Sequence, residues 1–487
     1  MASGKSEDEK NIGITVKKEQ DFSEWYTQIV LKGEFADYGP VQGTIAYRPA
    51  AYALWERIQQ IFDGMIKKTG HRNVYFPLLI PESYLLKEKQ HVEGFKAEVF
   101  WVTHGGDNEL GERYAVRPTS ETIIYGFYSK WVRSWRDLPV LLNQWCNVLR
   151  AEIKSTKPFV RGSEFLWQEG HTVHATEKEQ DSEVMMILNF YKEICENYLA
   201  LPVLVGRKSE REKFPGAVYT TTFELMMPDG KALQGGTSHG FGHNFSKPFN
   251  IKFLDRENKS QYAFTTSWGI STRLIGALLM VHGDDKGAVL PPKVAPVQVV
   301  IVPIYKTGEE KDVLKKANEV KKSLEDHGVS VTLDDRDDRT PGWKFSEHEM
   351  RGTPIRIEIG PRDVKEKKLV IVRRDTFEKK SVDEHIAVAA VENLLSDMQR
   401  NLFAKAKAAL DKQTSEVSDY HKFKEIIEKK GGYIRAEWCG DDKCEEKVKE
   451  ETGATLRVIP FDQPKTFGKC IVCGKKAKFN AYFARSY

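Results

Sequence analysis

Two consecutive apolar segments set the strongest constraint on what this chain can fold into. Val140 to Leu149 (VLLNQWCNVL) and Glu164 to His174 (EFLWQEGHTVH) both have the length and composition of β-strands. The residues that join them are polar, and an antiparallel pair closed by a loop is the simplest arrangement for such a sequence. We therefore expect the two segments to lie side by side in an antiparallel sheet.

The second segment carries an unusual set of side chains on one face. Residues two apart on a strand point to the same side of the sheet. This rule groups Phe165, Trp167, Glu169 and His171. Taken singly, Trp167 or His171 is more often an ordinary buried residue. A face with two aromatic rings, an acid and a histidine is costly as a core, because the polar groups lose water there. We interpret this face as part of a functional site.

The remainder of the first half mixes helical and extended patterns. Tyr52 to Lys68 has apolar residues at helical spacing, and Val74 to Ile80 (VYFPLLI) follows as an expected strand. Thr265 to Met280 is expected to be a strand that turns at Gly269 into an amphipathic helix. These patterns predict an α+β domain.

A proline-rich segment, Pro291 to Pro296 (PPKVAP), is the clearest linker in the chain. Beyond it, strands alternate with helices, which predicts an α/β domain with a largely parallel sheet. A charged helix from Asp383 to Gln413 leads into a small third α+β unit. The predicted organisation is a polar tail over 1–20 and domains over 21–290, 297–400 and 401–487.

Length and composition exclude several classes of protein. The chain has 487 residues, of which 40% are apolar and 30% charged, a composition typical of globular multidomain proteins. Its apolar stretches are far shorter than the roughly 20 residues of a membrane span. The amino terminus lacks the pattern of a secretory or organellar leader. We therefore expect a cytoplasmic protein without membrane contact.

Four of the six cysteines form two close pairs, Cys439-x4-Cys444 and Cys470-x2-Cys473. This spacing suits a closed tetrahedral zinc site with four thiolate ligands, which is structural because no position is left for water. Two disulfides are the alternative, but a reducing compartment disfavours them. The sequence therefore predicts structural Zn²⁺ in the third domain.

Three separated groups of residues together supply two arginines and other side chains that suit a nucleotide. They are Arg150-Ala151-Glu152 with Phe165, Gln234 with Thr237-Ser238-His239, and Arg273. Guanidinium groups stay charged and bind phosphate oxygens bidentately. A carboxylate and an aromatic ring suit an adenine amino group and a purine face. Any one arginine alone is more often a structural ion pair, so the prediction depends on the whole set.

Several motifs together resemble those of one enzyme family. RPTSET (117–122), Arg150-x-Glu152, EFLWQEGHT (164–172), LQGGTSH (233–239) and TSWGISTR (266–273) resemble the class II aminoacyl-tRNA synthetases. Specifically, they are similar to the prolyl-tRNA synthetases shared by archaea, the eukaryotic cytosol and some bacteria. The resemblance runs from about residue 20 to the end of the chain.

The resemblance implies an α+β catalytic domain with an antiparallel class II sheet, an α/β anticodon-binding domain and a small α+β zinc-binding domain. The implied reaction joins proline to ATP as prolyl-adenylate and transfers the prolyl group to the 3′ end of tRNA(Pro). Mg²⁺ is implied as a phosphate-bound partner. A homodimer is also implied, with an interface built by the helix and strand that end at Pro77.

The resemblance also implies individual residue roles. Arg150 is expected at the ATP α-phosphate, Glu152 at the adenine amino group, Phe165 at the adenine face and Arg273 at the γ-phosphate end, with both arginines catalytic. Gln234, Thr237 and Ser271 are expected to line the nucleotide site. The proline pocket is expected to comprise Thr119, Glu121, Arg150, Trp167, Glu169, His171, Phe214 and His239.

Two stretches depart from the usual family pattern, namely Gly162-Ser163 and the glycine-rich LQGGTSHGFGHNF from residue 233. The interval from about 172 to 265 is too short for the editing domain that many bacterial relatives insert there. Threonyl-, seryl- or histidyl-type enzymes on the same scaffold are alternatives. So is a catalytically silent paralogue, although such a protein is expected to have lost Arg150, Glu152 or Arg273.

Overall fold

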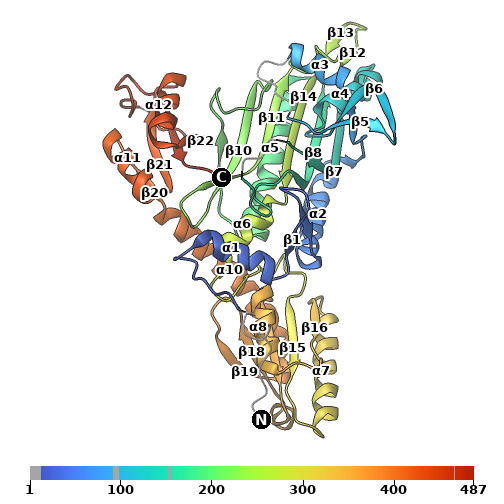
Figure 1. The fold of residues 1–487 in the computed structure, drawn as a ribbon, viewed down its shortest axis with the longest axis vertical. Coiled ribbons are helices and arrows are strands. Elements are labelled where there is room, and N and C mark those ends of the chain that lie inside the picture. Colours follow the sequence, from blue (N-terminus) through green and yellow to red (C-terminus); the bar gives the residue numbers. More distant parts are fainter. Residues whose placement is uncertain (1–12, 92–97, 152–154, 466) are drawn as a thin grey trace.

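The computed structural model describes residues 13–91, 98–151, 155–465 and 467–487 (Figure 1). The predicted pair forms β7 (Val140–Leu149) and β8 (Glu164–His174), with the bounds expected from the sequence. The strands run antiparallel, with Val140 opposite Val173 and Leu149 opposite Glu164. The predicted antiparallel pairing of these two strands is therefore confirmed.

β8 lies within a large sheet. β14 (Phe264–Ser271), β11 (Ala232–Gly242), β10 (Tyr219–Met226) and β9 (Leu204–Arg207) follow in that spatial order, each antiparallel to its neighbour. At the opposite edge, β3 (Arg72–Asn73) pairs parallel to β7. The expected class II antiparallel sheet is therefore present.

Helices bury one face of this sheet. α5 (Glu177–Glu193) packs along β10, β11 and β14, and one hydrophobic core joins it to α1 (Phe22–Lys32), α2 (Pro49–Lys68) and α6 (Arg273–His282). α5 begins with a capping box, because Thr176 Oγ1 accepts the Glu179 N–H at 3.3 Å and the Glu179 carboxylate accepts the Thr176 N–H at 3.0 Å. A π-helical turn, Ile194–Tyr198, follows α5 directly.

The expected strand over Val74 to Ile80 is wrong for residues 74–78, and only Leu79 and Ile80 lie in a strand. β3 ends at Asn73 and β4 (Leu79–Pro81) belongs to a different, three-stranded sheet with β6 (Asn108–Val116) and β5 (Trp101–Gly105). Pro77 has no N–H, and the Phe76 N–H donates to the Gln144 side chain at 2.5 Å instead of to a strand. The segment crosses from one sheet to the other.

The expected turn at Gly269 is also wrong. Gly269 is a paired residue of β14, opposite Thr237 and Glu169, and the chain turns at Thr272 before α6. A Cβ on Gly269 would lie 2.9 Å from the Gln168 carbonyl oxygen, so glycine permits close strand packing there. α6 is buried along most of its length rather than amphipathic.

The segment before α1 contacts the end of α6, and a hairpin follows α1. Within the predicted tail, residues 1–12 lie outside the described residues, whereas Lys18 Nζ donates to the Gly283 carbonyl oxygen at 2.7 Å. After α1, β1 (Ala36–Tyr38) and β2 (Ile45–Tyr47) form a hairpin.

The remaining elements near the sheet are α3 (Glu82–His91), α4 (Glu121–Trp131), η2 (Trp135–Asp137), β12 (Lys252–Leu254) and β13 (Ser260–Tyr262).

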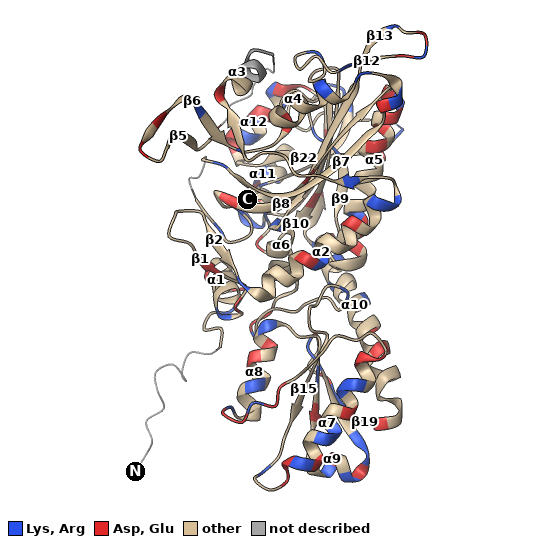
Figure 2. Cartoon of the chain, turned by 90° about the vertical axis from the view of Figure 1, so that its right-hand side faces the viewer, with Lys and Arg blue, Asp and Glu red and all other residues tan. Residues whose placement is uncertain are grey.

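The second unit, below the large sheet in Figure 1, has a five-stranded sheet in the order β16-β15-β17-β18-β19. The expectation of a largely parallel sheet is only half right, because β15 pairs parallel to β16 and β17 whereas β18 pairs antiparallel to β17 and β19. Figure 2 shows acidic and basic residues mixed along its helices. Its elements are β15 (Val299–Pro303), α7 (Glu310–Glu325), β16 (Val331–Leu333), α8 (Pro341–Arg351), β17 (Ile355–Ile359), α9 (Pro361–Glu366), β18 (Lys368–Arg373), β19 (Lys379–Asp383) and η4 (Glu384–Ile386).

The long helix α10 (Ala387–Lys412) leads to the third unit. The strands of this unit continue the large sheet, because β22 pairs with β9 through Ile459 opposite Arg207 and Pro460 opposite Gly206. Among the described residues, no helix combines the length and apolar character of a membrane span. The elements of this unit are β20 (Thr414–Glu416), α11 (Tyr420–Lys429), β21 (Tyr433–Trp438), α12 (Asp442–Thr452), β22 (Thr455–Pro460) and β23 (Phe479–Ala484).

Candidate active site and metal site

A cavity of about 180 Å³ opens on the face of the sheet formed by β8, β11 and β14. The predicted strand face and residues from all three predicted nucleotide groups meet there, although they are far apart in sequence. The predicted residues that line the cavity are Thr119, Glu121, Arg150, Phe165, Trp167, Glu169, Phe214, Gln234, Thr237, His239, Ser271 and Arg273.

Among the predicted site residues that the structure describes in this region, one does not line the cavity. His171 lies behind Glu169 and is 1% exposed. Glu152 lies outside the described residues. The remaining predicted residues are brought together, and their individual roles stay predictions.

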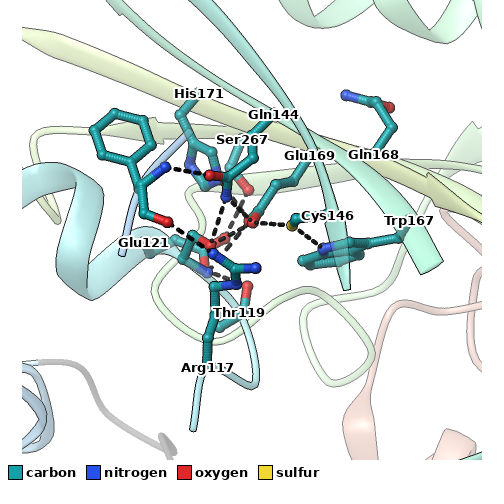
Figure 3. A network of polar contacts seen from close by, with 12 residues as sticks. Arg117, Thr119, Glu121, Gln144, Cys146, Trp167, Gln168, Glu169, His171 and Ser267 are labelled. Carbon is teal, nitrogen blue, oxygen red and sulfur yellow. Dashed lines mark hydrogen bonds and ion pairs between the residues drawn. The ribbon is translucent and has the colours of Figure 1, made fainter. Parts of the chain in front are cut away.

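Glu169 is buried at the centre of a polar network (Figure 3). Its Oε2 lies 2.9 Å from Nε2 of His171, and its Oε1 accepts hydrogen bonds from Gln144 Nε2 at 2.9 Å and from Ser120 Oγ. Burial alone raises the pKa of Glu169, but His171, Ser120 and Arg117 outweigh it and hold the pKa below its ordinary value. The carboxylate is therefore charged at neutral pH.

A second carboxylate, Glu121, is held from both sides. Thr119 Oγ1 donates to Oε2, and Ser267 Oγ donates to Oε1 at 2.8 Å. Glu121 is 3% exposed and lines the cavity. Two preoriented carboxylates at one end give the cavity an acceptor set suited to an ammonium group.

Aromatic rings form the neighbouring walls. Trp167 Nε1 donates to the Cys146 sulfur at 3.3 Å, which fixes the indole plane. The Phe214 ring packs on His239 with ring centroids 4.7 Å apart. Both ring nitrogens of His239 are hydrogen-bonded, Nδ1 to Thr220 Oγ1 and Nε2 to Thr237 Oγ1, each at 2.9 Å.

His239 is neutral in this setting. Burial, assisted by the nearby His171, lowers the pKa of His239 to about 3. The imidazole therefore contributes shape and hydrogen bonds to the site instead of positive charge.

Two arginines occupy the other end of the cavity. The guanidinium carbon of Arg150 lies 5.3 Å from the Phe165 ring centroid and 5.6 Å from the Trp167 ring centroid. Arg273 donates to the carbonyl oxygens of Val160 at 3.0 Å and Gln234 at 3.1 Å. Burial, together with the charge of Arg150, lowers the pKa of Arg273 to about 10. Both groups remain charged at neutral pH and suit a polyphosphate.

The glycine-rich departure from the family pattern has a packing reason. Gly235 and Gly236 lie in strand β11, where a Cβ would come within 2.0 Å of the Phe223 ring and 2.6 Å of the Gly269 oxygen respectively. Both glycines line the cavity. Sequence reasoning named neither glycine as a site residue, and it also missed Ser267, which donates to Glu121. The two adjacent glycines were the available signal for Gly235 and Gly236, whereas Ser267 lies within the TSWGISTR motif but was not singled out there.

The Gly162-Ser163 departure fits against the β1–β2 hairpin. Ser163 donates its N–H to Gly43 O at 2.7 Å and its hydroxyl to Gln42 O at 2.8 Å. Its own carbonyl oxygen accepts the Arg150 N–H at 2.7 Å. A Cβ on Gly162 would lie 2.8 Å from Gly43 O. This stretch therefore supports the backbone of Arg150.

The four predicted cysteine ligands come together in the third unit. Their sulfur atoms all lie within 4.8 Å of one another, and Cys439 Sγ is 3.7 Å from both Cys444 Sγ and Cys473 Sγ. A tetrahedron with zinc–sulfur bonds of about 2.3 Å has edges of about 3.8 Å. All four are free thiols, so the disulfide alternative is not realised. The donor set and its spacing fit zinc.

A second acidic and histidine group lies around α8, where Asp334, Glu347 and His348 are close together. Cations of the chain already occupy it. Arg336 bridges the two acids, at 2.7 Å from Asp334, and Lys344 Nζ donates to the Asp334 carbonyl oxygen at 2.9 Å. We assign no metal to this group.

Tyr487 packs against the first unit. The Tyr487 hydroxyl donates to Asp229 Oδ2 at 2.6 Å, and Lys157 Nζ lies 5.2 Å from the Tyr487 ring centroid. Lys157 belongs to the segment between β7 and β8. The terminal residue thus contacts the same loop region as Arg150.

Comparisons with known proteins agree with this architecture. Three family models match: "tRNA synthetase class II core domain (G, H, P, S and T)" over 100–282, "Anticodon binding domain" over 298–394 and "Prolyl-tRNA synthetase, C-terminal" over 420–487. The matched ranges follow the three units of the fold.

Curated relatives are similar over nearly the whole chain. The proline–tRNA ligase of Cenarchaeum symbiosum is 55% identical over 477 residues, covering 98% of this chain and 100% of the relative. That of Alkaliphilus oremlandii is 54% identical, covering 96% and 97%. A crystal structure of prolyl-tRNA synthetase from Cryptosporidium parvum, complexed with halofuginone and AMPPNP, has a TM-score of 0.94 and 44% identity, covering 98% and 100%. The chain therefore belongs to the proline–tRNA ligases, a family of class II aminoacyl-tRNA synthetases.

Proposed function

We propose that the cavity joins proline to ATP as prolyl-adenylate and then transfers the prolyl group to the 3′ end of tRNA(Pro). One observation carries the proposal: two hydrogen-bonded carboxylates, an aromatic wall and two charged guanidinium groups open into the same cavity. The Cryptosporidium parvum relative is complexed with AMPPNP, an ATP analogue, which supports ATP as the nucleotide for this chain.

Proline is assigned to the end of the cavity with the carboxylates. Its secondary ammonium carries two N–H donors, which Thr119 and Glu121 can accept. Trp167 and Phe214 flank the apolar ring. Glu169 and His171 hold this end in place, and neutral His239 packs against Phe214. Arg150 lies between the amino acid and the nucleotide.

ATP is assigned to the arginine end. Arg150 faces the α-phosphate, Arg273 the γ-phosphate end, and Phe165 the adenine ring. Gln234, Thr237 and Ser271 line the remaining wall, and Glu152 is assigned to the adenine amino group by the resemblance. We expect Mg²⁺ to enter with ATP as part of the substrate.

The chemistry requires positioning more than proton transfer. The proline carboxylate attacks the α-phosphorus in line, and pyrophosphate leaves. Arg150 stabilises the charge that develops on the α-phosphate oxygens, and the backbone bond from its N–H to Ser163 O keeps it in place. No general base is needed because the attacking carboxylate is already ionised.

The second and third units have supporting roles. We assign anticodon binding to 297–400, where α8 presents Trp343 with Arg336 and Arg339, whose guanidinium carbons lie 5.3 and 4.9 Å from the ring centroid. This surface suits unstacked bases. The third unit, 401–487, is assigned a structural Zn²⁺ held by Cys439, Cys444, Cys470 and Cys473.

A homodimer is proposed from an exposed apolar surface that follows α2. Tyr75 is 66% exposed, and Trp131 of α4, whose ring stacks on Phe76, is 46% exposed. Leu79 of β4 and Trp101 of β5 in the three-stranded sheet are 41% and 37% exposed. Apolar patches of this kind mark interfaces between chains. The proposed compartment is the cytoplasm, where thiol ligands remain reduced.

Amino-acid-dependent pyrophosphate exchange tests the proposed function. Across the standard amino acids, exchange should be fastest with proline. Preferential activation of threonine, serine or histidine would assign the chain to a related specificity, and no exchange with any amino acid would indicate a catalytically silent protein. Sedimentation of the purified chain tests the dimer separately.

A further inference from the structure

Phe214 belongs to the loop 208–218, which joins β9 to β10 beside the cavity. From the sheet side, the Phe214 N–H donates to Thr220 Oγ1 at 2.9 Å, and the ring packs on His239. These contacts hold Phe214 in place only if the residues that precede it in the loop keep their backbone conformation. The segment that determines this backbone conformation therefore affects the position of Phe214 at the amino-acid end of the site.

Ser209 sets the turn that leads into Phe214. Its carbonyl oxygen accepts the N–H groups of Glu212 at 3.2 Å and Lys213 at 2.9 Å. Its hydroxyl donates to Glu445 Oε1 at 2.9 Å. Ser209 and Glu445 are each only 2% exposed. Because Glu445 lies on α12, the third unit holds the loop at Ser209.

The stem of the same loop is also joined to the third unit. Glu224 of β10 is fully buried between Lys208, whose Nζ lies 2.6 Å from Oε1, and Arg457 of β22, whose Nη2 lies 2.9 Å from Oε2. Burial alone raises the pKa of Glu224, but Lys208 and Arg457 outweigh it and the pKa is lowered. The β22–β9 pairing continues the connection. The stem is therefore anchored to β22 of the third unit.

The Ser209–Glu445 contact joins the two units at a cost in folding free energy. Among the described residues, no group hydrogen-bonds Oε2 of Glu445, although this atom is buried. Burying a carboxylate with a single hydrogen bond costs free energy that an apolar contact would avoid. What the carboxylate contributes is a fixed direction for the Ser209 hydroxyl, and hence for the turn before Phe214.

We propose that Glu445 and Ser209 are positioning residues for Phe214, so that the third unit sets the affinity for the amino acid. No described residue of 401–487 lines the cavity, so the effect acts through the loop. When the contact is lost, substrate binding must order the loop, and this ordering opposes proline binding. ATP binding is not affected, because Arg150 and Arg273 are held by other segments. The inference rests on the proposed placement of proline beside Phe214.

Steady-state pyrophosphate exchange with Ser209→Ala and Glu445→Ala tests this inference. Each variant should raise KM for proline about tenfold, the factor associated with one lost hydrogen bond between buried side chains, while kcat and KM for ATP stay close to wild type. The double variant should raise KM no further than the more severe single variant, because both changes remove one contact. Glu445→Gln keeps an acceptor oxygen for the Ser209 hydroxyl, so its KM for proline should be close to that of wild type.

Glu446→Gln is the matched control. Glu446 is adjacent in sequence and pairs with Arg211 at 3.3 Å on the exposed side of α12, so its loss should leave KM for proline unchanged. Proline binding measured by calorimetry without ATP should give the same ranking of variants. Ser209→Ala removes only a hydroxyl, so it tests the inference even if Glu445→Ala does not fold.

Phe214→Ala separates this inference from the proposed function. If Phe214→Ala raises KM for proline but folded Ser209→Ala does not, Glu445 has only a structural role and the inference is overturned. If Phe214→Ala leaves KM for proline unchanged, proline does not bind against Phe214, and both the placement and the inference are wrong. A rise in KM for all three variants supports both.

Discussion

Nε2 of His171 lies 2.9 Å from Oε2 of Glu169, and both side chains are almost completely buried. Both residues lie on one face of β8, as the alternation of the sequence requires. The pair holds a charged carboxylate at one end of the cavity. This arrangement makes the stability of the fold depend on pH in a defined direction.

The first prediction concerns that pH dependence. The pKa of Glu169 is lower in the folded protein than in the unfolded chain, so the unfolded chain binds the proton more readily. The resulting stability is present above the unfolded value of about 4.3 and is lost as the pH falls through the folded value. Glu169→Gln should therefore show a shallower loss of melting temperature than wild type below about pH 4.3. Parallel curves for the two proteins would contradict the assignment.

The second prediction is that His239 does not titrate between pH 5 and 8. Burial lowers its pKa to about 3, so its ring should remain neutral throughout this range. NMR of the protein labelled at histidine, with His239→Gln used to assign the signal, measures this directly. A shift of the assigned signal with a midpoint near 6.5, the ordinary value for histidine, would show that the ring is accessible to protonation.

The third prediction concerns the metal. Cys470→Ala should release zinc and destabilise the third unit, because structural zinc contributes directly to folding free energy. Elemental analysis and limited proteolysis of 401–487 measure the two effects. Cys195→Ala is the control, since Cys195 is buried in the first unit and away from the cluster. Native protein without zinc would rule out the assignment.

The fourth prediction concerns errors of specificity. A pocket that fits the proline ring cannot exclude smaller amino acids, since each missing methylene changes discrimination by only about 1 to 3 kcal/mol. Alanine and cysteine should be activated slowly. The interval 172–265 is filled by α5 and by strands and loops from β9 to β13, all of them joined to the catalytic unit. Mischarged tRNA should therefore persist with the purified enzyme, and enzyme-dependent deacylation well above the spontaneous rate would show that editing occurs within this chain.

The sequence predicted the parts of the fold in which local pattern and tertiary pairing agree. β7 and β8 have long apolar or alternating segments and pair with each other, so their bounds were correct. Val74 to Leu78 is equally apolar, but this segment passes between two sheets and Phe76 bonds to a side chain. A single-sequence pattern contains no information about such a change of partner.

The same distinction applies to the site. The shared face of Phe165, Trp167 and Glu169 follows from the strand period, and the structure places all three along the cavity. Phe214 lies on an irregular loop, and only the family resemblance indicated it. Ser267 was missed because a serine in a strand has no distinguishing pattern, although it holds Glu121.

The central claim is that Arg150 serves the reaction of proline with ATP in this cavity. Proline-dependent pyrophosphate exchange by wild type and Arg150→Ala tests it most directly, with circular dichroism to establish that both proteins are folded. Exchange should fall by about 10² to 10³ in Arg150→Ala, the typical loss for one preorganised contact to a developing charge. Folded Arg150→Ala with exchange near the wild-type rate would contradict the account.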